Sequence, residues 1–578
     1  MIKQTRILER KHLGLVILFV STYVALFSLL NPVWFTNSKH SVDPWIYWGA
    51  GDEPRLSFQN DFARTYYLQR YVVILPKIIA FQVFGSFWGQ LVVAWIWILI
   101  TSTFLFKVAS RFISIGASIA LVIVLLSDPV IMGSFGSSYT MASTIGLYSI
   151  LLYLLTSDVS EFTERKKKIF IFFIGTVLTL LLNAYMTHGI SAMCLVACYV
   201  LIHRKRLGWQ FLWGISLVNV SLNLLIQTFY FALSSDPIPV VIRQLWFGIN
   251  LATSPNPYGS NGFLDFWMNV WKTELSYYWL TMMFVGIVSI LICFFIKFDK
   301  SKELEKVNLF ATLLFLSYFA QTFFHSNIVG YAWSACAMYI LKFIALLTLI
   351  ITFSRNKLQN MAATVLCFGS VVSLFAVYRS EVLLEAEFVR NGMFAISAGA
   401  VLLGLLLATS RIVFKKFILN HIGLLYFLLI FTLMMFHVLP IFRQFAVPYE
   451  ASFSETRRAY DLLSKQREVS LLVSNSLNPK PRIWFTPDSG TPLVSSQLFL
   501  YSLISNEIGK ANCSQVRWAA NYNSIIMSFA TSSATTTDVN KFYLNECGYR
   551  AVEITLSETL ATELELVGGK VWALRKEK

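Results

Sequence analysis

The sequence predicts an α-helical, polytopic membrane protein, and three observations support that fold class. The chain of 578 residues is 56% hydrophobic and only 13% charged, whereas soluble domains are roughly 45–50% apolar and about 25% charged. Apolar stretches of about 20 residues, the length that spans a bilayer, recur at short intervals. Aromatic residues make up 16% of the chain, as expected where aromatic rings gather at the two membrane interfaces.

The net charge of +16 reports membrane topology and does not indicate a nucleic-acid partner. Basic residues form short clusters between apolar stretches, and alternate connections lack such clusters. Cytoplasmic loops retain positive charge, so the clusters predict which connections are cytoplasmic. The clusters are Lys3/Arg6/Arg10/Lys11, residues 165–168, residues 204–206, Lys297/Lys300/Lys302/Lys306, Arg355/Lys357 and Arg411/Lys415/Lys416.

About 13 apolar stretches are read as spanning helices. With a cytoplasmic N-terminus, this number puts the C-terminus outside, and every basic cluster then falls inside. The first stretch is too long for the apolar part of a signal peptide and lacks a small-x-small cleavage site, so we expect a retained helix. The predicted spans are 13–35, 87–108, 113–127, 140–156, 168–184, 188–203, 209–231, 278–297, 307–323, 333–354, 360–378, 392–410 and 418–438.

Two predicted outer connections are long, residues 36–86 and 232–277, and long connections with little regular pattern are usually functional. The first contains an apolar stretch, residues 66–76, that is short and ends in Pro76. We expect Pro76 to interrupt this stretch, which then lies along the membrane interface.

The composition becomes polar after Pro440, which predicts two domains. Residues 1–440 form the transmembrane domain, and residues 441–578 form a small extracytoplasmic α/β domain. Cys513 and Cys547 both fall in this outer domain, and an oxidising compartment would favour a disulfide between them. Within it we expect a helix near 453–467 and strands at 482–486, 552–555 and 571–574.

Asp43 stands in the run SVDPWIYWG, residues 41–49, just outside the first predicted helix. A carboxylate among aromatic residues at the outer mouth of a membrane protein suggests chemistry on a lipid-borne substrate. The pair Asp43–Pro44 also has a structural explanation, because Asp favours the N-cap and Pro the first position of a helix. Both roles remain open for Asp43. If residues 44–48 are helical, Tyr47 lies one turn from Asp43 on the same face.

Farther along the same loop, Asp61 and Arg64 share a helical face, and Arg70 lies about two turns beyond this pair. The planar guanidinium binds phosphate through two parallel hydrogen bonds. One carboxylate with several guanidiniums is therefore a candidate base with a phosphate clamp. The plain alternative is that Asp61 and Arg64 form a solvated helix pair.

Other cationic or histidine side chains are candidates for binding sugar or phosphate. Lys342 lies inside the tenth predicted span, where an ionisable group is functional by default; the alternative is snorkelling or pairing with a neighbouring helix. His188 and His325 fall in short outer turns, where solvated histidines are common. Arg243 and Arg379 lie in outer loops.

Taken together, these features resemble the GT-C superfamily of membrane glycosyltransferases. The resemblance is carried by an acidic residue at the outer end of the first helix, an amphipathic first outer loop, the segment Arg70–Pro76–Gly85 and the overall topology. The superfamily includes oligosaccharyltransferases, protein O-mannosyltransferases and the aminoarabinose transferases that modify lipid A. By position it implies Asp43 as the catalytic carboxylate and Asp128, in the next outer loop, as a second acidic residue.

One departure from the family pattern leaves the catalytic residue open. The acidic pair expected on the first loop is not adjacent to Asp43, because Asp52 and Glu53 follow it by nine and ten residues. Either Asp43 or the Asp52/Glu53 pair does the work. The resemblance also leaves a divalent metal, Mg²⁺ or Mn²⁺, undecided, since some members need one and others do not. No nucleotide or redox cofactor is expected.

The activity that the resemblance implies is inverting transfer of a sugar from a polyprenyl-phosphate donor to a glycan, lipid or protein acceptor. It would take place on the outer face of the cytoplasmic (inner) membrane, with the C-terminal domain periplasmic. A transporter or flippase of lipid-linked sugars would explain the helices and Lys342 equally well. Such proteins often carry inverted repeats with interrupted helices, which this sequence lacks. A glycan polymerase is a third reading, distinguished by the length of its product.

Overall fold

In the computed structural model of the protein, the described part of the chain is mostly helical up to residue 352 and contains strands near the C-terminus. The described residues are 14–25, 47–48, 50–51, 54, 70–126, 129–136, 140–157, 163–234, 242, 302–324, 339–352, 482–484, 492–493, 502–505, 524–530, 548–555, 558 and 570–576. Predictions for the remaining residues lie outside the described structure.

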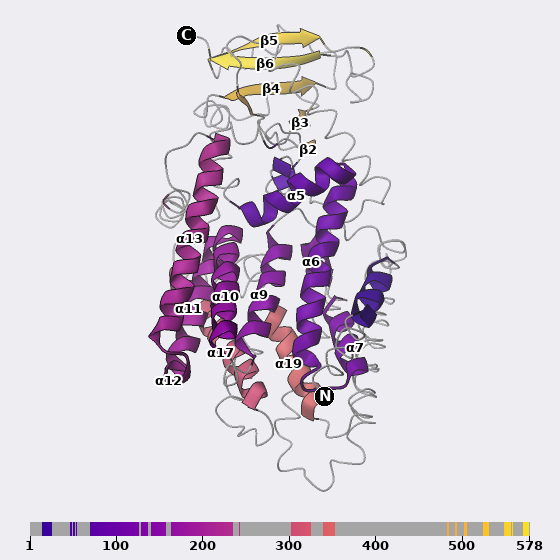
Figure 1. Cartoon of the computed structure of the whole chain (residues 1–578). Helices are drawn as coiled ribbons and strands as arrows, with labels where there is room; N and C mark the ends of the chain where they lie inside the picture. Colours follow the sequence, from indigo (N-terminus) through magenta and orange to yellow (C-terminus); the bar gives the residue numbers. More distant parts are fainter. Residues whose placement is uncertain are drawn as a thin grey trace.

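The helices pack side by side into a bundle (Figure 1). They are α5 (Tyr71–Phe84), α6 (Ser86–Ala109), α7 (Ile115–Leu126), α8 (Pro129–Gly136), α9 (Met141–Leu155), α10 (Glu164–Ala184), α11 (Met186–Ile202), α12 (Arg204–Leu207), α13 (Trp209–Ser234), α17 (Lys302–Phe324) and α19 (Tyr339–Thr352). Two of them organise the rest: α6 packs against α5, α7, α8 and α9, and α10 packs against α5, α9, α11 and α13.

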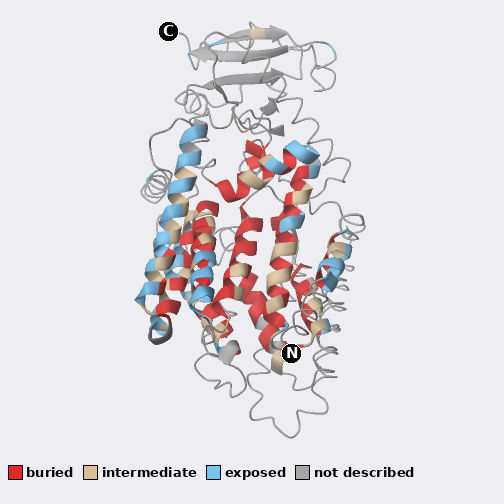
Figure 2. Cartoon of the chain, in the orientation of Figure 1, coloured by how far each residue is buried: buried red, intermediate tan, exposed pale blue. Residues whose placement is uncertain are grey.

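Three helices of the described part are long and apolar enough to cross a bilayer, over Trp88–Ala109, Glu164–Ala184 and Trp209–Phe229. They differ in what surrounds them. Half of each of the first two segments is buried in the protein, but only 11% of the third. Figure 2 shows α13 exposed along much of its length. Exposed side chains such as Trp213 and Leu217 are apolar, so α13 is the most lipid-exposed of these three described helices. The chain is a multi-pass membrane protein.

Most predicted spans in the described region coincide with helices to within a few residues. Those at 87–108, 113–127, 140–156, 188–203 and 209–231 correspond to α6, α7, α9, α11 and α13. The spans predicted at 278–297, 360–378, 392–410 and 418–438 lie outside the described residues.

The helix α10 begins four residues before the span predicted at 168, because the basic run joins it. Thr163 has extended backbone and its side chain accepts a hydrogen bond from the Lys166 backbone N–H, which is a standard N-cap. The Lys167 ammonium also donates to the Glu164 carboxylate at 2.8 Å. The cap extends the helix beyond its apolar part.

The described end of the stretch expected to stop at Pro76, residues 71–76, is instead part of α5, which continues through Pro76 to Phe84. The expectation of an interruption was wrong. Proline removes the hydrogen bond that its N–H would donate to Val72, but packing against α6 and α10 holds the helix together. Figure 1 shows α5 across the end of the bundle rather than along it, which fits a position at the membrane interface. Gly85, with φ of 75°, allows the chain to turn from α5 into α6.

The strands near the C-terminus form one mixed six-stranded sheet, in the order β2-β3-β4-β6-β5 with β1 paired to β4. β6 is antiparallel to both β4 and β5, whereas β1 and β3 run parallel to β4. The strands expected at 482–486, 552–555 and 571–574 coincide with β1, β5 and β6, and the sequence did not reveal the others. The strands are β1 (Arg482–Trp484), β2 (Pro492–Leu493), β3 (Ser502–Ser505), β4 (Ser524–Ala530), β5 (Tyr549–Thr555) and β6 (Lys570–Lys576).

Substituting Gly89 should loosen the contact between α5 and α6. A Cβ at Gly89 would lie 2.8 Å from the backbone carbonyl of Ala80 and 2.7 Å from the Phe81 ring, so the helices must separate. We expect Gly89→Ala to lower the midpoint of thermal unfolding in detergent, by roughly the 1–3 kcal/mol typical of overpacking.

Gly14→Ala is the matched control, because a Cβ at Gly14 meets nothing within 4 Å. Alanine also favours helix over glycine, so this control should leave the midpoint unchanged or raise it. Equal midpoints for the two variants would contradict the close approach of α5 to α6.

Candidate functional site

Arg70 lies at the start of α5 and is buried, with 3% of its surface exposed. Its backbone carbonyl accepts hydrogen bonds from the N–H groups of Val73 and Ile74, which fixes the first turn of the helix. The backbone position of Arg70 is therefore fixed at the end of the bundle, and its side chain is directed into the protein interior.

The guanidinium of Arg70 contacts two aromatic rings from distant parts of the sequence. Its Cζ atom lies 5.4 Å from the centre of the Tyr47 ring and 4.6 Å from that of Tyr185. Tyr47 belongs to the first loop, and Tyr185 is the extended residue that separates α10 from α11. A cation over an aromatic ring contributes about 2 kcal/mol or more when desolvated. Arg70 thus joins three segments at one point.

His188 contacts Tyr185, the residue whose ring also contacts Arg70. The centres of the Tyr185 and His188 rings are 5.1 Å apart. We expected His188 in a short outer turn, either binding sugar or phosphate or solvated, but it lies within α11 and is buried. The Tyr148 hydroxyl donates to the His188 backbone carbonyl at 2.8 Å, and the two rings meet edge to face. This pairing anchors the start of α11 on α9 and explains the burial.

Lys77 is a buried basic residue within α5, two turns after Arg70, so the two side chains start from the same face of the helix. Its Nζ lies 5.6 Å from the centre of the Tyr47 ring, so one ring contacts both cations. Burial lowers the pKa of Lys77 well below its usual value. An anion bound beside Lys77 would favour the charged form of the amine.

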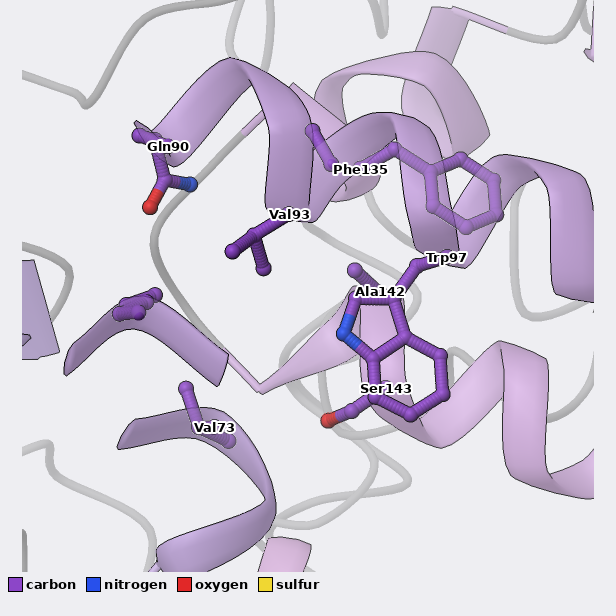
Figure 3. A pocket seen from close by; sticks show the side chains of 9 residues that line it. Val73, Gln90, Val93, Trp97, Phe135, Ala142 and Ser143 are labelled. Carbon is purple, nitrogen blue, oxygen red and sulfur yellow. The ribbon is translucent and has the colours of Figure 1, made fainter. Parts of the chain in front are cut away.

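A small cavity lies beside Lys77, between α5, α6, α8 and α9. Its volume is about 10 Å³, which is room for a single water at most. Figure 3 shows Gln90, Val93 and Trp97 of α6 facing Val73 of α5 across it. The cavity is too small for a sugar in this conformation.

Of the site residues predicted from the sequence, the structure brings together Tyr47, Arg70 and His188. Lys342 is buried as expected for a residue inside a span, but it lies on α19, which packs against α7, α9 and α17. It does not belong to the Arg70 group. The other predicted residues lie outside the described residues: Asp43, Asp52, Glu53, Asp61, Arg64, Asp128, Arg243, His325, Arg379, Cys513 and Cys547.

Sequence reasoning missed Lys77 and Tyr185, and only Lys77 left a readable signal. It is the single charged residue of α5, so its cost inside an apolar helix marked it as unusual. Tyr185 carries no such signal, because its role arises from the break between two helices. Within the described residues, no group of three or more His, Cys, Asp or Glu side chains gathers that could hold a metal ion.

Comparisons with known proteins do not assign this chain to a family. No protein-family model matches the sequence, and no curated protein matches it. Among solved structures, the fold is similar to the crystal structure of ArnT from Cupriavidus metallidurans in the apo state, at a TM-score of 0.35 and 14% identity. The overlap covers 97% of this chain and 98% of that one. A likeness at this level establishes neither family nor function.

The burial of Lys77 predicts a pH-dependent stability that Lys77→Met should remove. The unfolded chain binds more protons than the folded protein between the lowered pKa and the ordinary lysine value of about 10.4. Stability of the wild type should therefore rise with pH through that window. Thermal unfolding in detergent between pH 7 and 10 measures this rise, and Lys77→Met should give a higher midpoint at pH 7 and a flatter profile.

Lys168→Met is the control, since Lys168 is exposed near the start of α10 and its loss should not alter the profile. A wild-type profile parallel to that of Lys77→Met would show that Lys77 keeps its ordinary proton affinity.

Proposed function

We propose that this protein is a GT-C-type membrane glycosyltransferase that transfers a sugar from a polyprenyl-phosphate donor to a glycan, lipid or protein acceptor. The reaction takes place on the extracytoplasmic face of the cytoplasmic membrane, where the first outer loop and the C-terminal domain lie. The observation that carries the proposal is the pair of buried cations, Arg70 and Lys77, around the Tyr47 ring at one end of the bundle.

These cations suit the phosphate of a lipid-linked donor. Arg70 and Lys77 are buried beside one aromatic ring, and an anion bound there would favour the charged form of Lys77. The guanidinium of Arg70 is planar, and its N–H donors form a fork that matches two oxygens of a phosphate. In the low dielectric of a buried site these interactions are stronger than in water. Arg70 and Lys77 would stabilise the phosphate as it leaves.

The acidic residues of the first loop supply the other half of the reaction. Asp43 precedes Tyr47 by four residues, and four residues extend over at most about 14 Å. A carboxylate so close along the chain to Tyr47 is suited to act beside the two cations. Asp43 is therefore our proposed catalytic base, with Asp52, Glu53, Asp61 and Asp128 as further acidic candidates.

The chemical step is an inverting displacement at the anomeric carbon of the sugar. The acceptor hydroxyl gives its proton to the carboxylate, and its oxygen forms the new bond to that carbon. The bond from the anomeric carbon to the phosphate oxygen breaks on the opposite face, and polyprenyl phosphate departs with the electron pair. A positioned base typically contributes 10²–10⁴-fold, and fixed donors at the leaving oxygen contribute a comparable factor.

Other predicted residues keep supporting roles in this proposal. Tyr47 positions the two cations, and His188 packs behind Tyr185 rather than facing solvent. Arg64, Arg243, His325 and Arg379 are candidates for binding donor or acceptor, and Lys342 for a lipid phosphate deeper in the bundle. The acidic candidates that could hold Mg²⁺ or Mn²⁺ lie outside the described residues.

A flippase of lipid-linked sugars is the alternative that the same cations would serve. A buried cation pair binds a lipid phosphate whether or not a glycosidic bond then breaks. Translocation of a fluorescent polyprenyl-phosphate sugar in liposomes, without release of polyprenyl phosphate, would support this alternative. A glycan polymerase would instead build long products by repeated transfer.

The proposal predicts that Asp43→Asn and Arg70→Lys fail in different ways. Purified protein is given a panel of labelled polyprenyl-phosphate sugars and extracted membrane acceptors. Asp43→Asn should lower transfer by about 10²–10⁴-fold while still binding the donor. Arg70→Lys keeps the charge but loses the two-pronged contact, so it should raise the donor KM by about 10–100-fold, as expected for roughly 1.5–3 kcal/mol of charged hydrogen bonding.

Asp236→Asn is the matched control, because Asp236 also precedes a proline in a predicted outer loop and has no role in the proposal. It should transfer sugar at the wild-type rate. Normal transfer by Asp43→Asn with loss in Asp52→Asn/Glu53→Gln would move the base to that pair. Normal transfer by all these acidic variants would reject a first-loop base.

A further inference from the structure

A second group of cations gathers at the end of the bundle remote from α5. Lys107 is in the last turn of α6, 18 residues after Gly89, which at 1.5 Å per residue is about 27 Å along the helix. Arg111 follows in the turn after α6, and Lys306 is in the first part of α17. All three approach residues 153–157, where α9 ends.

Arg111 is held by hydroxyl groups rather than by a carboxylate. Its Nη1 donates to Thr156 Oγ1 at 3.0 Å and its Nη2 to Ser157 Oγ at 3.2 Å. Its Cζ lies 4.7 Å from the centre of the Tyr153 ring. Since a guanidinium carries five N–H donors, the hydroxyl bonds orient Arg111 and leave donors for a further acceptor.

Lys107 shares the same aromatic ring. Its Nζ lies 5.5 Å from the centre of the Tyr153 ring and 5.6 Å from that of Phe104, and these two rings pack against each other. Lys306 closes the group, because its Nζ donates to the Ser157 carbonyl at 3.3 Å. The three cations come from two segments, the end of α6 with its following turn and the start of α17, and all are half-buried.

Lys107 and Arg111 lie beside the same Tyr153 ring, and two like charges so placed are more stable with an anion beside them. Within the described part of the chain neither Lys107 nor Arg111 forms an ion pair; their contacts are with hydroxyl groups and rings. Half-buried charges repel more strongly than solvated ones. A phosphate offers several acceptor oxygens to the group at once.

The position of the three cations in the bundle points to a lipid headgroup as the source of a phosphate. Lys107 lies two residues before the end of the apolar segment Trp88–Ala109, which is long enough to span a bilayer, so it lies near the level of the lipid headgroups. The basic residues of α12 and of the start of α10 share this end of the bundle, which the charge bias marks as cytoplasmic. Basic pockets between helices on that side bind anionic headgroups.

We propose that Lys107, Arg111 and Lys306 form a binding site for the phosphate of an anionic glycerophospholipid in the cytoplasmic leaflet. The rings of Tyr153 and Phe104 form its apolar floor, and the hydroxyls of Thr156 and Ser157 hold Arg111 in place. A lipid here clamps α6, α9 and α17 together at the end remote from the proposed transfer site.

The full chain, purified in a neutral detergent, tests this site. Phosphatidylglycerol should raise the midpoint of thermal unfolding, and phosphatidylcholine with the same acyl chains should not. Native mass spectrometry should find phosphatidylglycerol retained on the wild type. In Lys107→Gln/Arg111→Gln the apparent affinity should fall at least 10-fold, and higher salt should weaken binding to the wild type.

Lys166→Gln/Lys168→Gln is the matched control, since it removes two exposed positive charges from the same end of the bundle and should keep wild-type affinity. If the double variant does not fold, Lys107→Gln alone removes one cation and none of the hydrogen bonds of Arg111, and it should weaken binding. Equal binding by this variant and the wild type overturns the proposal. Equal stabilisation by inorganic phosphate at the same concentration also overturns it, since the site would then accept free phosphate without a lipid.

Discussion

Burial of a guanidinium among aromatic rings is the constraint on which one end of this protein depends. Removing a cation from water is costly, and the cost is reduced where opposite charges, polar groups or aromatic rings replace the water. Arg70 finds these rings in Tyr47 and Tyr185. Because the rings come from the first loop and from the break between α10 and α11, the burial of one side chain requires three segments to meet.

The surrounding packing keeps that meeting point in place. α5 crosses the end of the bundle, and Gly89 allows it to lie close against α6. On the other side, the Tyr148 hydroxyl ties α9 to the start of α11 at the His188 carbonyl, immediately after Tyr185. The helices therefore hold the residues around Arg70 in place. The side chains of Arg70 and Lys77 both extend from α5 or its first turn. A site built on helices holds its geometry more closely than one built on loops.

The sequence predicted the membrane fold class well because hydrophobic length is a local property. The starts and ends of α6, α7 and α9 can be read from composition alone, whereas the start of α10 depends on the Thr163 cap. Pro76 was misread, since the packing that tolerates it cannot be seen in the stretch itself. Of the site, Tyr47 and Arg70 could be proposed from charge and spacing. The role of Tyr185 could not, because it depends on which helices become neighbours.

The two ends of the bundle treat positive charge differently, and this difference separates their roles. At the α5 end the cations are buried, and Lys77 has a lowered pKa. Such a site can respond to the arrival and departure of an anion, as a reaction site must. At the other end Lys107 and Arg111 remain half-exposed, and hydroxyl groups fix Arg111 in orientation. Charges held in that way favour a resident ligand over a reacting one. In the two proposals, the same physical chemistry of cations and rings would therefore serve turnover at one end of the bundle and lipid binding at the other.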